Sequence, residues 1–314
     1  MSTAADSIEP NPIAAAVEQR DWSVAEPEDA LRWCERYTRD HGENFTVVSW
    51  FLPRRLRAPM FAVYAFCRFT DNLGDEAAGG PERRLELLDE WEHDVRRAFS
   101  ADAEPQHPIQ RALQVVARSK PLRLEPFQKL IEANRLDQRQ SRYPLFQDVL
   151  GYCELSANPV GEMVLALWEI DDEHRRALSD ATCTALQLSN HWQDVRRDFQ
   201  AGRLYLPLED LRCYDLTEAD IADQIAAGQA DRRFRALLRF EVDRAEAWFR
   251  QGERLIDEVP RELAIDLRLF TDGGRAVLNA IRHQDYDVLA RRPRVSTSTR
   301  AWLALRAAVQ LKLG

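Results

Sequence analysis

Apolar residues recur at helical spacing along nearly the whole chain from Glu26 onward. Several of the segments begin with proline, which fits a first helical turn because the N–H that proline lacks has no partner there. The pattern predicts helices that begin near Pro27, Arg57, Pro81, Pro108, Glu125, Pro159, Asp172, Glu218, Asp231, Arg261 and Thr299.

Signals for β-strands are weak. The chain has 12 glycines, and no Asn-Gly or Asp-Gly turn joins two alternating apolar runs. Breaks at Gly79-Gly80 and from Gly202 to Pro207 look like turns between helices. Residues 1–24 carry Pro10 and Pro12 and predict a loose tail. Because no long polar linker divides the rest, we expect one all-α domain of about ten helices over residues 25–314.

Composition excludes some partners. Apolar residues make up 45% and charged residues 30%, as in soluble globular proteins. The net charge of −9 argues against nucleic acid as a partner. Five scattered cysteines indicate a reducing compartment. No secretory signal is visible, and the longest apolar run, Ala58–Cys67, is too short to span a bilayer. We expect a cytoplasmic protein with at most a peripheral contact at the inner face of the membrane.

Two carboxylates share one helix face at Asp71 and Asp75, because residues four apart lie side by side on a helix. Such a pair is usually a solvated surface. Here the pair ends a strongly apolar helix that includes Met60, and it lies at the C-terminal end, where negative charge is unfavourable. This arrangement favours the mouth of a cavity.

A second polar stripe is more specific. Asn190, Asp194 and Asp198 follow Gln187 by three, seven and eleven residues, which places all four on one narrow face. Carboxylate and amide oxygens suit Mg²⁺, which shares its remaining positions with water and substrate phosphates. The alternative is a polar seam in which Arg196-Arg197 pairs with the acids.

Two such faces turned toward each other predict a magnesium site that could hold a diphosphate ester. Arg203 follows the second stripe, and its guanidinium could bind phosphate through two parallel hydrogen bonds. Gly202 permits the turn that would bring this side chain back to the site. The alternative is an ordinary helix end with one surface arginine.

These segments resemble the squalene/phytoene synthase family. Residues Gln187–Pro207 are similar to its Q-x-x-N-x-x-x-D-x-x-x-D-x-x-x-G-R-x-Y-x-P signature, with every fixed position present. Tyr64–Glu76 resembles its first aspartate-rich motif, Tyr152–Met163 a third block, and Arg282–Ser296 its C-terminal segment. The resemblance covers roughly residues 40 to 296.

The resemblance implies an all-α isoprenoid-synthase fold around a central cavity, Mg²⁺ as cofactor and an isoprenoid diphosphate as substrate. The implied metal ligands are Asp71, Asp75, Asn190, Asp194 and Asp198. Positions implied to contact the diphosphate, line the substrate site or guide a carbocation are Arg54, Tyr64, Arg68, Tyr152, Gln187, Arg203 and Tyr205, with Arg54 the weakest.

Within the family, two stretches are similar to the hydroxysqualene synthases of bacterial hopanoid biosynthesis: Asn44-Phe45 with Ser49-Trp50, and Ser156–Gly161. Such enzymes take presqualene diphosphate, release diphosphate and capture the rearranged cation with water. Phe45 is a candidate to stabilise the cation with its ring face. A partner enzyme that makes presqualene diphosphate could hand it over.

Two alternatives stay open. The first is a head-to-head prenyl synthase that makes presqualene diphosphate, squalene, dehydrosqualene or phytoene from two allylic diphosphates. The second is a non-catalytic helical assembly factor or lipid-binding scaffold. A protein of the second kind should have lost metal ligands, and this chain keeps all five, which favours an enzyme.

Individual residues carry further expectations. Asn158 is a candidate to position the quenching water, because an amide both donates and accepts. It could equally cap a helix that starts at Pro159. His191 lies about 100° off the polar stripe and should be a packed or surface residue. Asn72 and Arg197 stand where relatives often carry acids, so the charge near the metal is expected to differ while metal binding survives.

Overall fold

The computed structural model describes residues 26–41, 52–299, 302–303 and 306. Within these ranges the regular structure is helical, apart from one isolated bridge between Arg142 and Leu204. The prediction of an all-α fold is therefore confirmed. The expected tail at residues 1–24, like Phe45, lies outside the described residues.

Twelve α-helices and one short 3₁₀ helix follow one another in the described residues. The first six are α2 (Pro27–His41), α4 (Arg54–Asp75), α5 (Gly80–Ala98), α6 (Pro108–Ala117), α7 (Glu125–Asp137) and α8 (Phe146–Ser156). The others are α9 (Asn158–Leu167), α10 (Glu173–Gln200), α11 (Leu208–Cys213), α12 (Glu218–Ala227), α13 (Arg232–Gly252), η1 (Glu253–Asp257) and α14 (Arg261–His283).

Most helices begin within three residues of the predicted positions, for local reasons. Asp172 and Asp231 are the N-caps of α10 and α13, and each side chain accepts a hydrogen bond from the backbone N–H three residues later. Thr217 caps α12 in the same way. The sequence did not predict α8 or α11. Residues 297–299 are also helical, two residues before the expected start at Thr299.

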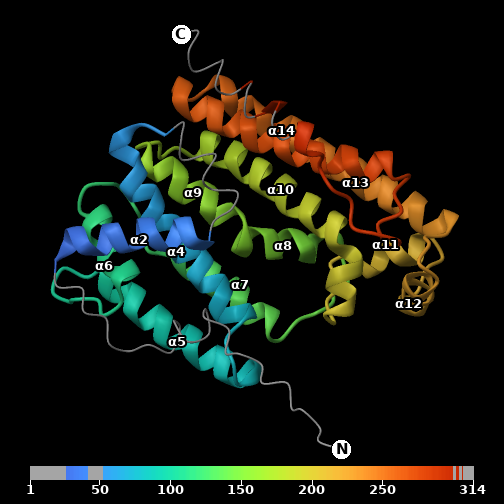
Figure 1. The fold of residues 1–314 in the computed structure, drawn as a ribbon, viewed down its shortest axis with the longest axis horizontal. Helices are drawn as coiled ribbons and strands as arrows, with labels where there is room; N and C mark the ends of the chain where they lie inside the picture. The colour runs from blue at the N-terminus through green and yellow to red at the C-terminus, as the bar shows by residue number, and fades with distance from the viewer. Residues whose placement is uncertain (1–25, 42–51, 300–301, 304–305, 307–314) are drawn as a thin grey trace, which may run out of the picture.

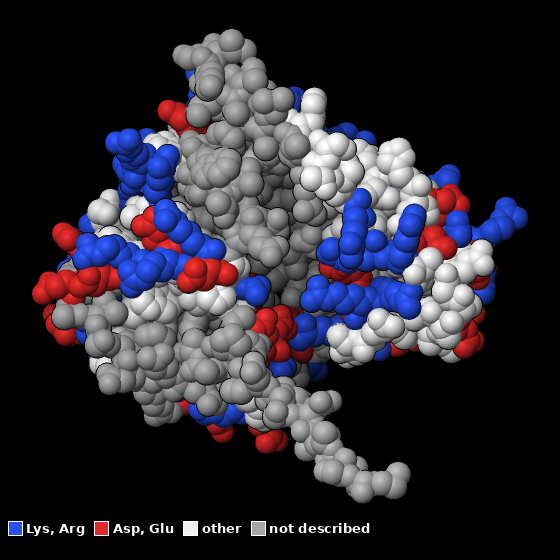
Figure 2. Space-filling model, viewed as in Figure 1, with Lys and Arg blue, Asp and Glu red and all other residues white. Residues whose placement is uncertain are grey.

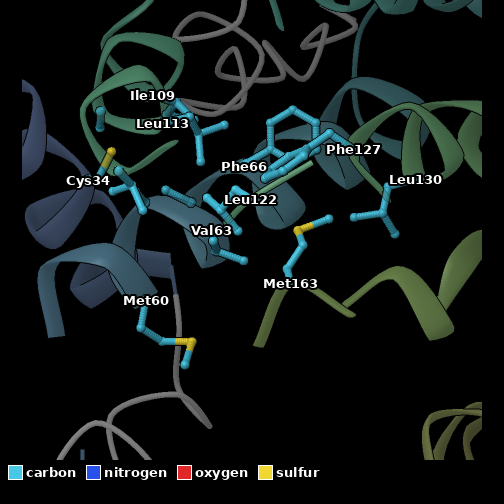
Figure 3. Close-up of a cluster of buried hydrophobic side chains, with 14 of the residues drawn as sticks. Cys34, Met60, Val63, Phe66, Ile109, Leu113, Leu122, Phe127, Leu130 and Met163 are labelled. Atoms are coloured by element: carbon cyan, nitrogen blue, oxygen red, sulfur yellow. The ribbon is translucent and has the colours of Figure 1, made fainter. Parts of the chain in front are cut away.

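The buried side chains form two clusters. One is centred on α2, α4, α5, α6, α7 and α9 and the other on α8 and α10 to α14, and α7, α10 and α14 contribute buried side chains to both. Figure 3 shows part of the first cluster, where Phe66 of α4 and Phe127 of α7 meet edge to face with ring centroids 4.9 Å apart. Such aromatic pairs add to the free energy gained by burial, so α4 and α7 are held together beside the site described below.

The longest helix, α10, runs through the middle of the molecule between α8 and α9 on one side and α13 and α14 on the other (Figure 1). Its 28 residues span about 42 Å at 1.5 Å per residue. The second polar stripe occupies its C-terminal half, and the first acidic pair ends α4. None of the described helices is long and apolar enough to cross a membrane.

Candidate active site

A cleft of about 260 Å³ opens where the ends of α4, α7 and α10 meet. Basic and acidic side chains gather near the centre of this face of the molecule (Figure 2). The structure brings both predicted acidic faces to this one cleft. Among the residues predicted from the sequence, its lining includes Asp71, Asp75, Tyr152, Gln187, Asn190, Asp194, Asp198, Arg203 and Tyr205.

A glycine lets α7 come close to the first acidic pair. A Cβ atom on Gly74 would lie 2.1 Å from Oδ1 of Asn134, so only glycine fits this packing. The close approach places the Asn134 side chain beside the pair, where its Nδ2 donates to Oδ1 of Asp71 at 3.4 Å. Asn134 is therefore a cleft residue that the spacing of the acids did not reveal.

The turn after α10 brings an arginine back to α4. Gly202 adopts a left-handed conformation with φ of 84°, and the backbone N–H of Arg203 donates to the carbonyl of Asp198 at 2.8 Å. From this turn, both terminal nitrogens of Arg203 lie 3.1 Å from Oδ1 of Asp75. Arg203 therefore joins the two motifs, and its binding of phosphate stays a prediction.

The carboxylates create a strongly negative pocket. Water reaches Asp71 from the cleft, but the surrounding protein desolvates the carboxyl group, and together with the charge of Asp75 this raises its pKa to about 7. Burial and the neighbouring Asp194 likewise raise the pKa of Asp198 to about 7, although Arg197 and Arg203 oppose the shift. A divalent cation in the cleft would relieve this repulsion.

A third carboxylate fixes two tyrosines at the cleft wall. The hydroxyl of Tyr152 donates to Oδ2 of Asp137 at 2.9 Å, and that of Tyr205 donates to Oδ1 at 3.3 Å. Burial raises the pKa of Asp137 to about 6. His191 stacks on Tyr205 with ring centroids 3.8 Å apart, and burial lowers its pKa to about 3. His191 is thus a packed, neutral residue, as expected, although its edge lines the cleft.

Three predicted site residues lie elsewhere. Arg54 is exposed at the start of α4, 17 residues and so about 25 Å along the helix from Asp71, and the structure does not bring it to the cleft. Arg68 and Tyr64 precede the acidic pair on the same helix but are not part of the cleft lining. Arg68 forms an ion pair with Glu76 at 3.7 Å, and its charge lowers the pKa of Asp71.

Asn158 is also outside the cleft. It is the first residue of α9 and is buried, and its Oδ1 accepts a hydrogen bond from Oγ1 of Thr184 at 3.1 Å. The helix-cap interpretation is wrong, because the N-cap position is Ala157 and no side-chain cap bond forms there. Asn158 lines a separate cavity of about 570 Å³ beside Asp180 and Trp248.

The two departures from the family pattern have different surroundings. Asn72 is buried, and its Nδ2 donates to the hydroxyl of Tyr37 at 2.9 Å, so it holds α4 to α2 and faces the core. Arg197 is exposed, and neither it nor Arg196 forms an ion pair with the acids of the stripe in the described part of the chain. The polar-seam alternative is therefore wrong. Asp194 is paired instead with Arg292, from a segment that follows α14.

The donor set suits Mg²⁺. No three or more Asp, Glu, His or Cys side chains among the described residues are arranged to hold a metal ion by themselves. The cleft is instead lined by two separate carboxylate pairs, by the further carboxylate of Asp137, and by the side-chain amides of Asn134, Gln187 and Asn190. Mg²⁺ is commonly bound by one or two carboxylates with substrate phosphates and waters completing its octahedron, so these residues fit a site that is completed by a diphosphate.

Comparison with known proteins decides the family. A family model described as squalene/phytoene synthase matches residues 38–299, which include both acidic faces and the turn at Arg203. The chain belongs to the squalene/phytoene synthase family. Members of this family are enzymes that act on isoprenoid diphosphates and generally depend on divalent metal, which agrees with the donor set of the cleft.

Solved structures of the family support the fold. A squalene synthase, HpnC, from Alicyclobacillus acidocaldarius is 47% identical, with a TM-score of 0.76 over 84% of this chain and 97% of that chain. A dehydrosqualene synthase solved in complex with a ligand is 25% identical, with a TM-score of 0.78 over 92% and 98%. The 15-cis-phytoene synthase of Synechococcus elongatus is 31% identical over 289 residues, 88% of this chain and 91% of the relative. The isoprenoid-synthase fold is thereby confirmed.

Proposed function

We propose that this protein converts presqualene diphosphate and water into hydroxysqualene and diphosphate, with Mg²⁺ as cofactor. The observation that carries the proposal is the cleft in which Asp71 and Asp75 face Asp194 and Asp198, with Arg203 between the two pairs. The relative of 47% identity is a squalene synthase, whereas the 31% identical relative is a phytoene synthase, which favours C30 chemistry.

The cleft residues would hold the diphosphate end of the substrate. Asp71 and Asp75 on one side and Asn190, Asp194 and Asp198 on the other would bind Mg²⁺. When bound, the metal supplies positive charge that stabilises the leaving diphosphate. Asp71 and Asp198 must lose their protons before they can act as ligands.

Arg203 adds a fixed positive charge beside the leaving group. Its side chain is 26% exposed and held by Asp75, so the guanidinium is oriented before substrate arrives. The C–O bond of the ester breaks with its electron pair on the diphosphate. A water molecule then forms the new C–O bond to the rearranged cation and releases one proton. Arg203 therefore contributes to cleavage of the C–O bond, where negative charge develops on the diphosphate, and not to the capture of water.

Aromatic rings at the cleft wall would stabilise the carbocation that remains after diphosphate leaves. Asp137 fixes the hydroxyls of Tyr152 and Tyr205, and Tyr205 also stacks on Tyr143, with ring centroids 5.5 Å apart. These contacts lock the orientation of the rings at the cleft wall. The negative face of an aromatic ring stabilises a nearby cation, so Tyr152 can stabilise the carbocation as diphosphate departs.

The position of Asn158 bears on the capture of water. Its side chain lines a different cavity from the acidic cleft and is committed to Thr184. Replacing Asn158 with Gly tests its role through the ratio of hydroxylated to other C30 products. An altered ratio at unchanged stability would support a role in positioning water, and a loss of stability alone would show that the residue is structural.

The alternative is synthesis of presqualene diphosphate, squalene, dehydrosqualene or phytoene from two allylic diphosphates. The names of the phytoene synthase relatives favour it. Incubation of the purified protein with farnesyl diphosphate and, separately, with presqualene diphosphate distinguishes the two. If presqualene diphosphate is the substrate, a head-to-head prenyl synthase must supply it, and a hand-over between the two enzymes at the membrane surface is part of the proposal.

A further inference from the structure

A short segment after α14 is fastened across α10. We call residues 289–293 the strap. Arg196 of α10 donates through Nη1 to the carbonyls of Leu289 at 2.9 Å and Ala290 at 2.7 Å. The buried Gln193 donates through Nε2 to the carbonyl of Pro293 at 2.8 Å. The strap is therefore held at both ends by side chains of the helix that carries the second polar stripe.

From the strap, Arg292 reaches the metal-ligand candidate Asp194. Its Nε bonds Oδ1 of Asp194 and its Nη2 bonds Oδ2 at 2.9 Å, so the guanidinium engages both carboxylate oxygens. The same Nη2 lies 3.1 Å from Oε1 of Gln193. Asp194 is 15% exposed and Arg292 is 48% exposed. Arg292 thus covers the mostly buried carboxylate of Asp194, while about half of the arginine side chain stays exposed to solvent.

A metal ion and this arginine require the same oxygen atoms. Each carboxylate oxygen has two lone-pair positions, and a bidentate guanidinium occupies one on each oxygen and neutralises the charge, so it competes with a cation for this carboxylate. The bonds made by Arg196 and Gln193 to the strap involve its backbone, so the Arg292 side chain can leave without undocking the segment. It can turn into a groove of about 790 Å³ between α14 and the strap, which Arg291 and Arg294 also line.

We propose that Arg292 is an internal counter-ion that occupies Asp194 in the substrate-free protein and is displaced when metal binds. This inference rests on the proposed role of Asp194 as a metal ligand. The arrangement lowers the affinity of the second carboxylate pair for free metal, and it favours metal that arrives together with a diphosphate.

The test is metal binding by the full-length, substrate-free protein. Mn²⁺ serves as a paramagnetic probe, and free Mn²⁺ is measured by electron paramagnetic resonance. We expect Arg292→Gln to bind Mn²⁺ about three- to fivefold more tightly than the unchanged protein, the upper range that a partly exposed ion pair can supply. Arg292→Lys should fall between them, because lysine keeps the charge but lacks the bidentate fork.

Arg291→Gln is the matched control. It removes the same charge one residue away, but among the described residues the Arg291 side chain donates only to Oε1 of Gln284, at 3.3 Å. Its Mn²⁺ affinity should stay within about twofold of the unchanged protein, since long-range charge effects are screened by salt. Asp194→Asn should weaken Mn²⁺ binding both in the unchanged protein and in the Arg292 variants. Circular dichroism verifies that each variant is folded.

Equal or weaker binding by Arg292→Gln, or no detectable binding by any of the proteins, would overturn the inference. The same gain in Arg291→Gln would also overturn it, because the effect would then be one of general charge. Mn²⁺ binding requires no turnover, so this test can fail or succeed independently of the test of the proposed function. If Arg292→Gln binds Mn²⁺ more tightly but the protein makes no C30 product, the proposed function is rejected and the counter-ion role is kept. If the protein makes the product but Arg292→Gln has unchanged Mn²⁺ affinity, the counter-ion role is rejected and the proposed function is kept.

Discussion

The guanidinium of Arg203 lies 3.1 Å from Oδ1 of Asp75, although 128 residues separate them in the chain. Arg203 belongs to the turn that ends the second polar stripe, and Asp75 ends the first acidic pair. This one contact therefore joins the two motifs across the cleft. It also leaves a positive charge at the place where a diphosphate would bind.

Replacement of Arg203 tests this relationship. Arg203→Gln should lower kcat about 10²- to 10³-fold, the usual effect of removing one preorganised group that stabilises the leaving charge. Arg203→Lys should recover only part of the loss because it cannot bond bidentately. Steady-state kinetics with circular dichroism as the folding control measure both. Wild-type activity in Arg203→Gln would show that the contact with Asp75 is structural only.

The proposed metal ligands should be indispensable for turnover. Asp71→Asn and Asp194→Asn each keep the shape of the side chain but remove the charge that binds Mg²⁺, so activity should be abolished while the fold stays intact. Asp223→Asn, on the exposed side of α12, is the control and should retain full activity. Mg²⁺-dependent activity at the usual rate in either cleft variant would refute the metal assignment.

Stability should depend on pH in a characteristic direction. The pKa values of Asp71 and Asp198 are raised to about 7, above the value near 4 expected in the unfolded chain. The folded protein therefore binds more protons than the unfolded chain between about pH 4 and 7, and these two groups lose their stabilising effect as pH rises through that window. Mg²⁺ competes with protons and should restore stability at the alkaline end.

Thermal unfolding at pH 6 and pH 8, with and without Mg²⁺, measures this effect. The rise in Tm caused by Mg²⁺ should be larger at pH 8, where the carboxyl groups are ionised without the metal. In Asp71→Asn, the rise in Tm caused by Mg²⁺ should differ less between pH 6 and pH 8. An equal rise in Tm at both pH values would show that these carboxyl groups do not bind the metal.

The approach of α7 to α4 can be tested at Gly74. A Cβ there would lie 2.1 Å from Asn134 Oδ1, so Gly74→Ala should destabilise the protein by about 1–3 kcal/mol and lower activity. The control is Gly273→Ala in α14, where no atom lies within 4 Å of the added Cβ and stability should be unchanged or rise by up to about 1 kcal/mol. Denaturant unfolding measures both. The double variant Gly74→Ala, Asn134→Ala should regain stability, and failure to do so would reject the packing explanation.

The sequence predicted the all-α fold and the two acidic faces because both depend on local spacing, whereas a cavity between the faces was implied by the family resemblance. Carboxylates four residues apart on a helix share a face wherever the helix packs, so Asp71 with Asp75 and Asp194 with Asp198 could be paired in advance. The helices that were missed have weak start signals. Leu145, at the N-cap of α8, has no polar side-chain atom, and α11 has only six residues.

The residues that were missed at the site depend on tertiary packing. Asn134 meets Asp71 across 63 residues, and Arg292 meets Asp194 across 98. No helical period connects such pairs. Asp137 shares a face of α7 with Asn134, but its role requires Tyr152 and Tyr205 to come from two other segments. Asn158 was singled out by a difference in sequence pattern, which carries no information about the direction in which a side chain points.

The most direct test of the central claim is a product analysis with two substrates. The purified protein is incubated with Mg²⁺ and either presqualene diphosphate or farnesyl diphosphate, and the extracted lipids are identified by mass spectrometry, with H₂¹⁸O as solvent in a parallel sample. We predict consumption of presqualene diphosphate only, with a C30 alcohol that carries ¹⁸O. Consumption of farnesyl diphosphate to a hydrocarbon or to presqualene diphosphate, with no labelled alcohol from either substrate, would contradict the account.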